Sequence, residues 1–298
     1  MANANIDMIR QLVASSGLDE PTIADQRAGL ERTAGALPAP DGVTVVATTL
    51  GGRPAERITP VNGGPAAASV VLYLHGGGYC IGSLSTHRNL AGRLALARGG
   101  PVVTLDYRLA PEHPFPAAVD DAVAAYRELL DGDTPATSIA IAGDSAGGGL
   151  TVATLLALRA AGLPQPAAAA CLSPWTDLTQ SGATYLSRAE ADPLITRAGL
   201  DAMAGAYLDG HPADDPLASP LFADLTGLPP LVVHVGDAEM LLDDAVRLSD
   251  HAVTAGVDLT LRVWDDMIHV FQAFPPELLP ESDASIAAIA EFLDDHLR

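Results

Sequence analysis

A serine between glycines is the residue of this chain whose surroundings most clearly suggest chemistry. Ser145 lies in the sequence Gly-Asp-Ser-Ala-Gly-Gly, between a strand-like apolar run and a helix-like segment. A serine hydroxyl is reactive only when a sharp turn presents it to a base and an oxyanion site. Gly143 and Gly147 lack side chains where such a turn would clash, although close helix packing is an alternative interpretation. The motif predicts a nucleophile, with the Ala146 amide facing the developing oxyanion.

A second motif, His-Gly-Gly-Gly at 75–78, directly follows the apolar run 70–74. Three successive glycines allow the backbone to approach a ligand closely and to turn its amides inward. A flexible linker is the alternative, but a linker is not expected at the end of a buried strand. In an α/β hydrolase such a loop supplies further oxyanion donors, and the loss of one donor typically costs about 3–4 kcal/mol in the barrier.

The general base is expected late in the chain, because the order in this fold is serine, acid, histidine. His269 lies just past the strand-like run 259–264 and fits that place best. His234 lies inside an apolar run and is interpreted as a core residue. A purely structural role for His269 is the less favoured alternative.

Four carboxylates follow the strand-like run 231–235 and are candidates for the acid: Asp237, Glu239, Asp243 and Asp244. Asp237 is close enough to the strand end to serve only as a turn cap. Asp243 and Asp244 lie one turn into the next helix, where we expect them to face solvent. Glu239 is favoured, because from the preceding loop its carboxylate could reach the imidazole, fix its tautomer and stabilise the imidazolium.

The elements that must position these residues alternate between short apolar runs and helix-length segments. Runs that are apolar throughout suit strands buried on both faces, and the alternation predicts an α/β fold with a mostly parallel central sheet flanked by helices. The segment 184–220 breaks the alternation and holds a helix predicted from about Thr196 to Tyr207; long insertions of this kind are often lids. Residues 1–36 read as amphipathic helices. The strand-like runs are 43–49, 55–58, 69–74, 102–105, 139–142, 168–172, 231–235 and 259–264.

Taken together, these motifs resemble the bacterial hormone-sensitive lipase family of α/β-hydrolase esterases. The resemblance spans nearly the whole chain. It implies a single α/β-hydrolase domain over 1–298, with a helical cap formed by 1–40 and 184–220. It also implies Ser145 as nucleophile, His269 as base and an oxyanion hole from the amides of Gly77, Gly78 and Ala146. The segments that carry it are 75–78, Asp-Tyr-Arg-Leu-Ala-Pro-Glu at 106–112, Phe-Pro-Ala at 115–117, 143–148, Ser-Pro-Trp-Thr-Asp at 173–177 and His-Val-Phe at 269–271.

The chain departs from the family pattern at two places. The usual acid motif is Asp-Pro-Leu followed by a further acid, whereas here Glu239 begins the sequence Glu-Met-Leu-Leu-Asp. Glutamate lengthens the arm by one methylene, as in some members of the family. Asp266 stands where members of the family often have glycine; three residues before His269, its carboxylate could compete for the imidazole.

Composition excludes several classes of function. The net charge of −21 disfavours nucleic acid and anionic membranes as partners. All 16 basic side chains are arginine, so mechanisms that need lysine are excluded. Dinucleotide-binding and zinc-protease motifs are absent, and no cofactor or metal is expected. With no visible signal peptide or apolar span, we expect a cytoplasmic protein with Cys80 and Cys171 as buried free thiols.

The sequence therefore predicts a carboxylesterase that hydrolyses a small-molecule ester through Ser145, His269 and Glu239, with an acyl-enzyme intermediate. Short acyl chains are the expectation from the family. A lactone, acetyl-ester or amide hydrolase with the same triad is one alternative, and a non-catalytic small-molecule receptor on the same fold is another. The resemblance also permits a homodimer formed through the last strand, 259–264.

Overall fold

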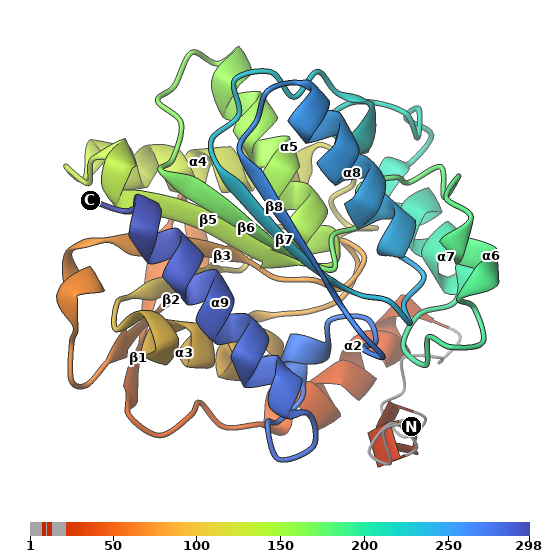
Figure 1. The fold of residues 1–298 in the computed structure, drawn as a ribbon, viewed down its shortest axis with the longest axis horizontal. Coiled ribbons are helices and arrows are strands. Elements are labelled where there is room, and N and C mark those ends of the chain that lie inside the picture. Colours follow the sequence, from red (N-terminus) through yellow and green to blue (C-terminus); the bar gives the residue numbers. More distant parts are fainter. Residues whose placement is uncertain (1–7, 10, 14–21) are drawn as a thin grey trace.

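The computed structural model describes residues 8–9, 11–13 and 22–298, which fold around one 8-stranded sheet (Figure 1). The strand order is β1-β2-β4-β3-β5-β6-β7-β8. The first three strands in this order pair antiparallel, and every later neighbouring pair is parallel. The strands are β1 (Val43–Leu50), β2 (Arg53–Pro60), β3 (Val70–Leu74), β4 (Val102–Leu105), β5 (Ile139–Asp144), β6 (Ala168–Leu172), β7 (Leu231–Gly236) and β8 (Leu259–Trp264).

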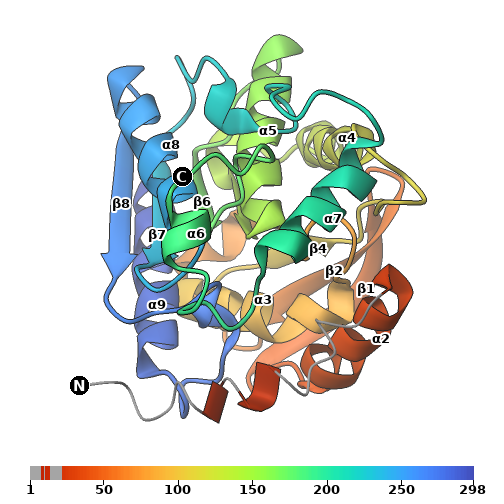
Figure 2. The same cartoon turned by 90° about the vertical axis from the view of Figure 1, so that its right-hand side faces the viewer.

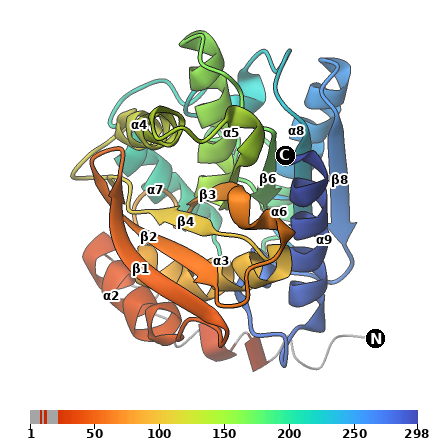
Figure 3. The same cartoon turned by 90° about the vertical axis from the view of Figure 1, so that its left-hand side faces the viewer.

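Alternating side chains of the parallel strands enter two separate cores. In β3, Val70, Leu72 and Leu74 join one cluster, whereas Val71 and Tyr73 join the other. The first core lies beneath α4 (Ala117–Asp131), α5 (Ala146–Ala160) and α8 (Leu242–Thr254), and the second beneath α3 (Leu84–Arg98) and α9 (Pro280–His296), on the opposite face (Figures 1 and 3). The predicted α/β fold with a mostly parallel sheet is confirmed.

Three further helices lie near the end of the sheet toward which the parallel strands point. These are α2 (Ile23–Thr33), α6 (Thr184–Ser187) and α7 (Arg197–Leu208), and Figure 2 shows all three on the side that faces the viewer. α7 matches the helix predicted within the 184–220 segment. Of the helices predicted over 1–36, α2 is present and Ile9 is buried, while residues 1–7, 10 and 14–21 lie outside the described part.

Short 3-10 turns complete the chain, and β8 forms one edge of the sheet. Across the residues that the model places, no helix combines the length and apolar character needed to cross a membrane. Cys80 and Cys171 are buried free thiols, and burial raises the pKa of each to about 12. The 3-10 turns are η1 (Ala34–Ala36), η2 (Pro65–Ala68), η3 (Ala136–Ser138), η4 (Pro220–Phe222) and η5 (Phe271–Ala273).

Candidate active site

The chemistry-bearing residues lie in loops that follow adjacent parallel strands. β3, β5, β6, β7 and β8 are neighbours in the sheet, so their carboxyl ends meet at one edge. The His-Gly-Gly-Gly loop follows β3, Ser145 follows β5, Glu239 follows β7 and His269 follows β8. In parallel α/β sheets, ligands bind outside this edge. Residues that are far apart in the sequence are thereby brought together at a single site.

Ser145 occupies a strained turn between β5 and α5. Its φ of 52° and ψ of −121° lie in a region that non-glycine residues rarely adopt. The Ser145 amide donates to the Leu172 carbonyl at 2.8 Å, and the Ser145 carbonyl accepts from the Trp175 amide at 2.9 Å. A Cβ at Gly147 would lie 2.0 Å from the Leu74 carbonyl oxygen, so this turn requires glycine there. The side chain is thus held by backbone contacts with neighbouring strand ends.

The imidazole of His269 lies between the serine and a carboxylate. Nε2 is 2.9 Å from Ser145 Oγ, and Nδ1 is 3.5 Å from Glu239 Oε1. In the tautomer whose Nδ1–H faces Glu239, Nε2 accepts the hydrogen bond from the serine hydroxyl. Burial lowers the pKa of His269, but the hydrogen bond and charge of Glu239, together with the charges of Asp192 and Asp144, outweigh that effect and raise the pKa above its ordinary value. The imidazole is therefore a stronger base than a free histidine.

The carboxylate of Glu239 is fully buried and held by two other donors. Its Oε2 accepts from the Ser173 hydroxyl at 2.8 Å and from the Gly236 amide at 3.1 Å. Ser173 Oγ in turn accepts from the Val270 amide at 3.0 Å. Ser173, which follows β6, therefore ties the loop of the acid to the loop of the histidine.

The other carboxylates considered for the acid are engaged elsewhere. Asp237 accepts from the Asp266 amide at 2.7 Å, and Asp266 is exposed. Asp243 accepts from the Thr184 amide at 3.1 Å. The expectation that Asp244 faces solvent is wrong, because this residue is fully buried. It accepts from the amides of Thr176 and Asp177 and from the Tyr185 hydroxyl. These contacts brace the loop after β6 against α8.

The glycine-rich loop places its backbone close to the serine turn. Gly77 and Gly78 have φ values of 111° and 58°. Among the described residues, the backbone amides of Gly77, Gly78 and Ala146 donate no hydrogen bond within the protein. Asp144, beside the serine, accepts from the Gly76 amide at 3.1 Å and from the Tyr73 hydroxyl at 2.8 Å. The loop and the serine turn are therefore linked through this buried carboxylate.

Helices α2 and α7 contact the same loop from outside the sheet. A Cβ at Gly78 would lie 2.1 Å from the sulfur of Met203 on α7, and the rings of Tyr79 and Tyr207 stack with centroids 3.8 Å apart. From α2, Arg27 donates through Nε to the Cys80 carbonyl at 2.7 Å. The segments that were predicted to form a cap thus reach the predicted oxyanion loop.

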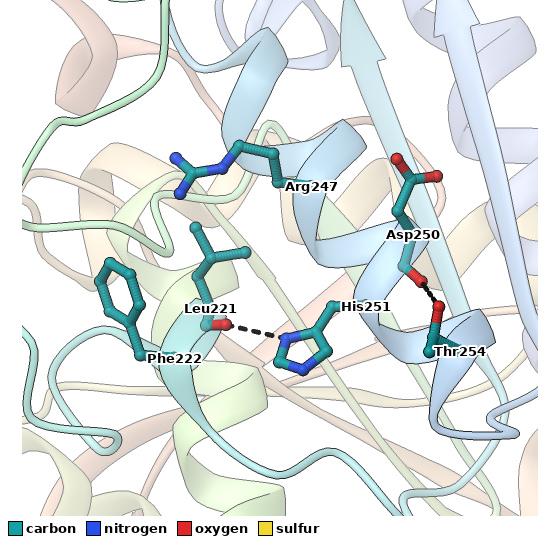
Figure 4. A pocket seen from close by; sticks show the side chains of 6 residues that line it. All are labelled: Leu221, Phe222, Arg247, Asp250, His251 and Thr254. Carbon is teal, nitrogen blue, oxygen red and sulfur yellow. Dashed lines mark hydrogen bonds between the residues drawn. The ribbon is translucent and has the colours of Figure 1, made fainter.

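A surface pocket beside α8 offers no competing chemistry (Figure 4). His251 Nδ1 lies 3.0 Å from the Leu221 carbonyl oxygen, and Arg247 donates to Asp177 at 2.9 Å, so these polar groups are used within the protein. None of its lining residues belongs to the serine site: Leu221, Phe222, Arg247, Asp250, His251 and Thr254. Nor does the described part of the chain bring together three histidine, cysteine or acidic side chains that could hold a metal ion.

Comparison with known proteins identifies the family. The family model described as alpha/beta hydrolase fold matches residues 71–273. The crystal structure of an esterase from the bacterial hormone-sensitive lipase family is 46% identical, covers all of both chains and superposes with a TM-score of 0.95. The chain belongs to this family of α/β-hydrolase esterases. Like its relatives, this esterase is a serine ester hydrolase.

Two further relatives bear on the chemistry. An acetyl-hydrolase of Streptomyces hygroscopicus is 44% identical, over 98% of this chain and 97% of its own. A crystal structure of EstE5, described as soaked with p-nitrophenyl butyrate, is 44% identical, covers 99% of both chains and has a TM-score of 0.92. The esterase therefore matches these relatives over nearly their full length.

Some residues that hold the site were not found by motif analysis. Ser173 was noted only as part of a family segment, and its contacts with Glu239 and Val270 span 66 and 97 residues. Asp192, which precedes a proline, belongs to none of the motifs. Its carboxylate accepts from the Met240 amide, 48 residues away, at 3.0 Å. The Asp-Pro pair would have suggested a turn, but nothing in the sequence indicates which loop it contacts.

Proposed function

We propose that this esterase is a carboxylesterase for short-chain acyl esters that acts through a Ser145–His269–Glu239 triad. The observation that carries the proposal is the 2.9 Å separation of Ser145 Oγ and His269 Nε2, at a serine held in a strained turn. Strain of this kind recurs where a fold presents a nucleophile. Glu239, beyond the imidazole, completes the order of groups that acyl transfer requires.

In the proposed acylation step, His269 Nε2 takes the proton from Ser145 as its oxygen attacks the ester carbonyl. The oxyanion is stabilised by the amides of Gly77, Gly78 and Ala146, none of which is used by hydrogen bonds between described residues. Collapse of the tetrahedral intermediate breaks the ester bond, and the imidazolium gives its proton to the leaving alcohol. Glu239 stabilises the imidazolium and keeps Nε2 directed at the serine.

In the proposed deacylation step, water replaces the alcohol and the same imidazole accepts its proton. The hydroxide attacks the acyl-enzyme carbonyl, and collapse of the second intermediate returns the proton to Ser145 and releases the acid. The preference for short acyl chains is supported by the burial of Ser145, which is 8% exposed, and by the contact of α7 with the glycine loop. The relative named an acetyl-hydrolase supports the same preference.

The proposal is tested with p-nitrophenyl esters of increasing acyl length. We expect kcat/KM to be highest for acetate or butyrate and to fall steeply for long chains. Ser145→Ala should abolish turnover and labelling by a fluorophosphonate, whereas Ser187→Ala, at the end of α6, should change neither. Undiminished hydrolysis by Ser145→Ala would refute the triad, and a preference for long chains would refute the substrate class. Lactone and p-nitroanilide substrates in the same panel separate the ester from the lactone and amide alternatives.

A further inference from the structure

A second buried carboxylate supports the loop that carries Glu239. Asp192 is 6% exposed and lies in the segment between α6 and α7. Its Oδ2 accepts from the Met240 amide at 3.0 Å, and its Oδ1 accepts from the amides of Leu194 and Ile195 at 3.0 and 3.3 Å. Hydrogen bonds from amides favour the ionised form of a carboxylate. A negative charge is thus held one peptide away from the predicted catalytic acid.

The same segment also packs against the loop of the histidine. Leu194, two residues after Asp192, lies against an apolar cluster that includes Met267 and Ile268, the two residues that precede His269. Asp192 therefore contacts the acid loop, while its near neighbour Leu194 packs against the cluster to which the base loop contributes. This placement relates one short segment to both partners of the serine.

An uncharged side chain, that of Thr184, holds the other end of residue Met240. The Thr184 hydroxyl donates to the Met240 carbonyl at 2.8 Å and accepts from the Asp243 amide at 3.0 Å. Thr184 and Asp192 thus bind opposite ends of residue Met240, one without charge and one with charge. A substitution at Thr184 therefore removes hydrogen bonds to this loop without removing a charge, whereas a substitution at Asp192 removes both.

The charges around His269 come from three elements. The titratable groups that interact with its imidazole are Glu239 after β7, Asp192 before α7 and Asp144 at the end of β5. The pKa of Asp192 is raised above its ordinary value, because burial and the nearby charge of Glu239 outweigh the lowering effects of His269 and of the Met240 amide. Asp144 is committed to the Tyr73 hydroxyl and the Gly76 amide. Asp192 is the carboxylate besides Glu239 that interacts with both the base and the acid loop.

We infer that Asp192 is a positioning residue for the proposed triad: from the cap segment it fixes the loop of Glu239 and supplies a second negative charge that stabilises the His269 imidazolium. The inference rests on the proposed function. The charge acts in the proton-transfer step, in which His269 becomes positive as Ser145 attacks the ester. The amide contact acts throughout the cycle, because it holds the Glu239–Met240 peptide.

The test compares Asp192→Asn with Thr184→Val in the full chain. For each variant, kcat/KM for p-nitrophenyl butyrate is measured as a function of pH, which gives an acidic limb and a plateau. We expect Asp192→Asn to lower the plateau of kcat/KM by about tenfold or more, as displaced catalytic groups do. We also expect its acidic limb to move to lower pH, because loss of a negative neighbour lowers the pKa of His269. Thr184→Val removes two hydrogen bonds to the loop and should lower the plateau, but it removes no charge and should leave the acidic limb unmoved.

Two controls define the outcomes. Asp201→Asn removes an equal charge from the exposed side of α7 and should leave both plateau and limb at wild-type values. Asp192→Glu, which restores the charge, should return the limb toward wild type. If Asp192→Asn does not fold, Asp192→Ser is measured in its place.

An acidic limb that stays at its wild-type pH in folded Asp192→Asn or Asp192→Ser would overturn the inference, and so would an equal shift in Thr184→Val. Ser145→Ala is assayed in parallel. Activity in that variant would refute the triad itself, which is a different result from an unmoved limb.

Discussion

Replacing Glu239 with glutamine removes one charge and forces a choice of hydrogen bonds. In the wild type, Glu239 Oε2 accepts from the Ser173 hydroxyl and the Gly236 amide, while Oε1 faces His269 Nδ1. If the glutamine carbonyl keeps the two donors, its NH₂ group faces Nδ1. That arrangement favours the tautomer with the proton on Nε2, which cannot accept the proton of Ser145. The reverse arrangement leaves two buried donors without an acceptor.

The size of the effect follows from this choice. An unsatisfied buried donor costs about 1–3 kcal/mol, so two of them disfavour the productive tautomer by about 2–6 kcal/mol. Because about 1.4 kcal/mol corresponds to a factor of ten, we expect kcat to fall by a factor between about 30 and about 2 × 10⁴. Loss of the carboxylate also lowers the pKa of His269, which Glu239 raises. The acidic limb of kcat/KM should therefore lie at a lower pH in Glu239→Gln than in the wild type.

The assay is steady-state hydrolysis of p-nitrophenyl butyrate across the acidic and neutral range. Glu239→Asp keeps the charge but shortens the arm, and its kcat should lie between those of Glu239→Gln and the wild type. Asp237→Asn and Asp266→Asn serve as controls and should retain near-wild-type turnover, since these residues bind one another through the Asp266 amide. A larger loss at either aspartate, or a glutamine variant with more than about a tenth of the activity, would refute the reasoning.

Two other substitutions test the support of the oxyanion loop. Gly78→Ala places a Cβ 2.1 Å from the sulfur of Met203, at a residue whose φ is 58°. Displacement of one proposed oxyanion donor should lower kcat by about 10²- to 10³-fold. Adding Met203→Ala should recover part of the lost kcat. No recovery in the double variant, with both proteins folded, would contradict the proposed clash. Asp144→Asn removes the charge of a carboxylate that binds Tyr73, Gly76 and His87. We expect the free energy of unfolding, measured by denaturant titration, to fall by about 1–3 kcal/mol. We also expect a lower kcat with little change in KM. Wild-type stability and turnover would exclude this role.

The parts of the fold governed by local rules were predictable from the sequence. Five of the runs that are apolar throughout became strands buried on both faces, namely β3, β4, β5, β6 and β7. The expectation is wrong for the last run, 259–264, which forms β8: as an edge strand it leaves most of its side chains exposed or half-buried. The serine turn was predictable because the Gly-x-Ser-x-Gly spacing marks it: a Cβ at Gly143 would clash with the Gly147 carbonyl within the turn, and a Cβ at Gly147 would clash with the end of β3. Ordering along the chain then indicated the positions of Glu239 and His269. Dimer formation through β8 stays a prediction.

The contacts that fix the site could not be predicted, because they join distant segments. Asp244 was expected to face solvent, yet its partners Thr176 and Asp177 lie 68 and 67 residues away. One local signal for its burial was present: Asp244 and Leu248 are four residues apart, and therefore share a face of α8. For Asp192 no such signal exists, since the position of its Met240 partner depends on how the 184–220 segment folds back onto the sheet.

The 184–220 segment does more than cover the site. A cover that only encloses substrate would affect acyl-chain preference and substrate binding. Here the segment also binds the acid loop through Asp192 and Thr184, and α7 contacts the oxyanion loop through Met203. Because both loops hold groups that act in the proposed transition state, a change in how the segment docks should alter kcat as well as KM. We therefore expect the strand ends to bring the proposed catalytic groups together, and the 184–220 segment to fix the final positions of Glu239 and of the proposed oxyanion amides.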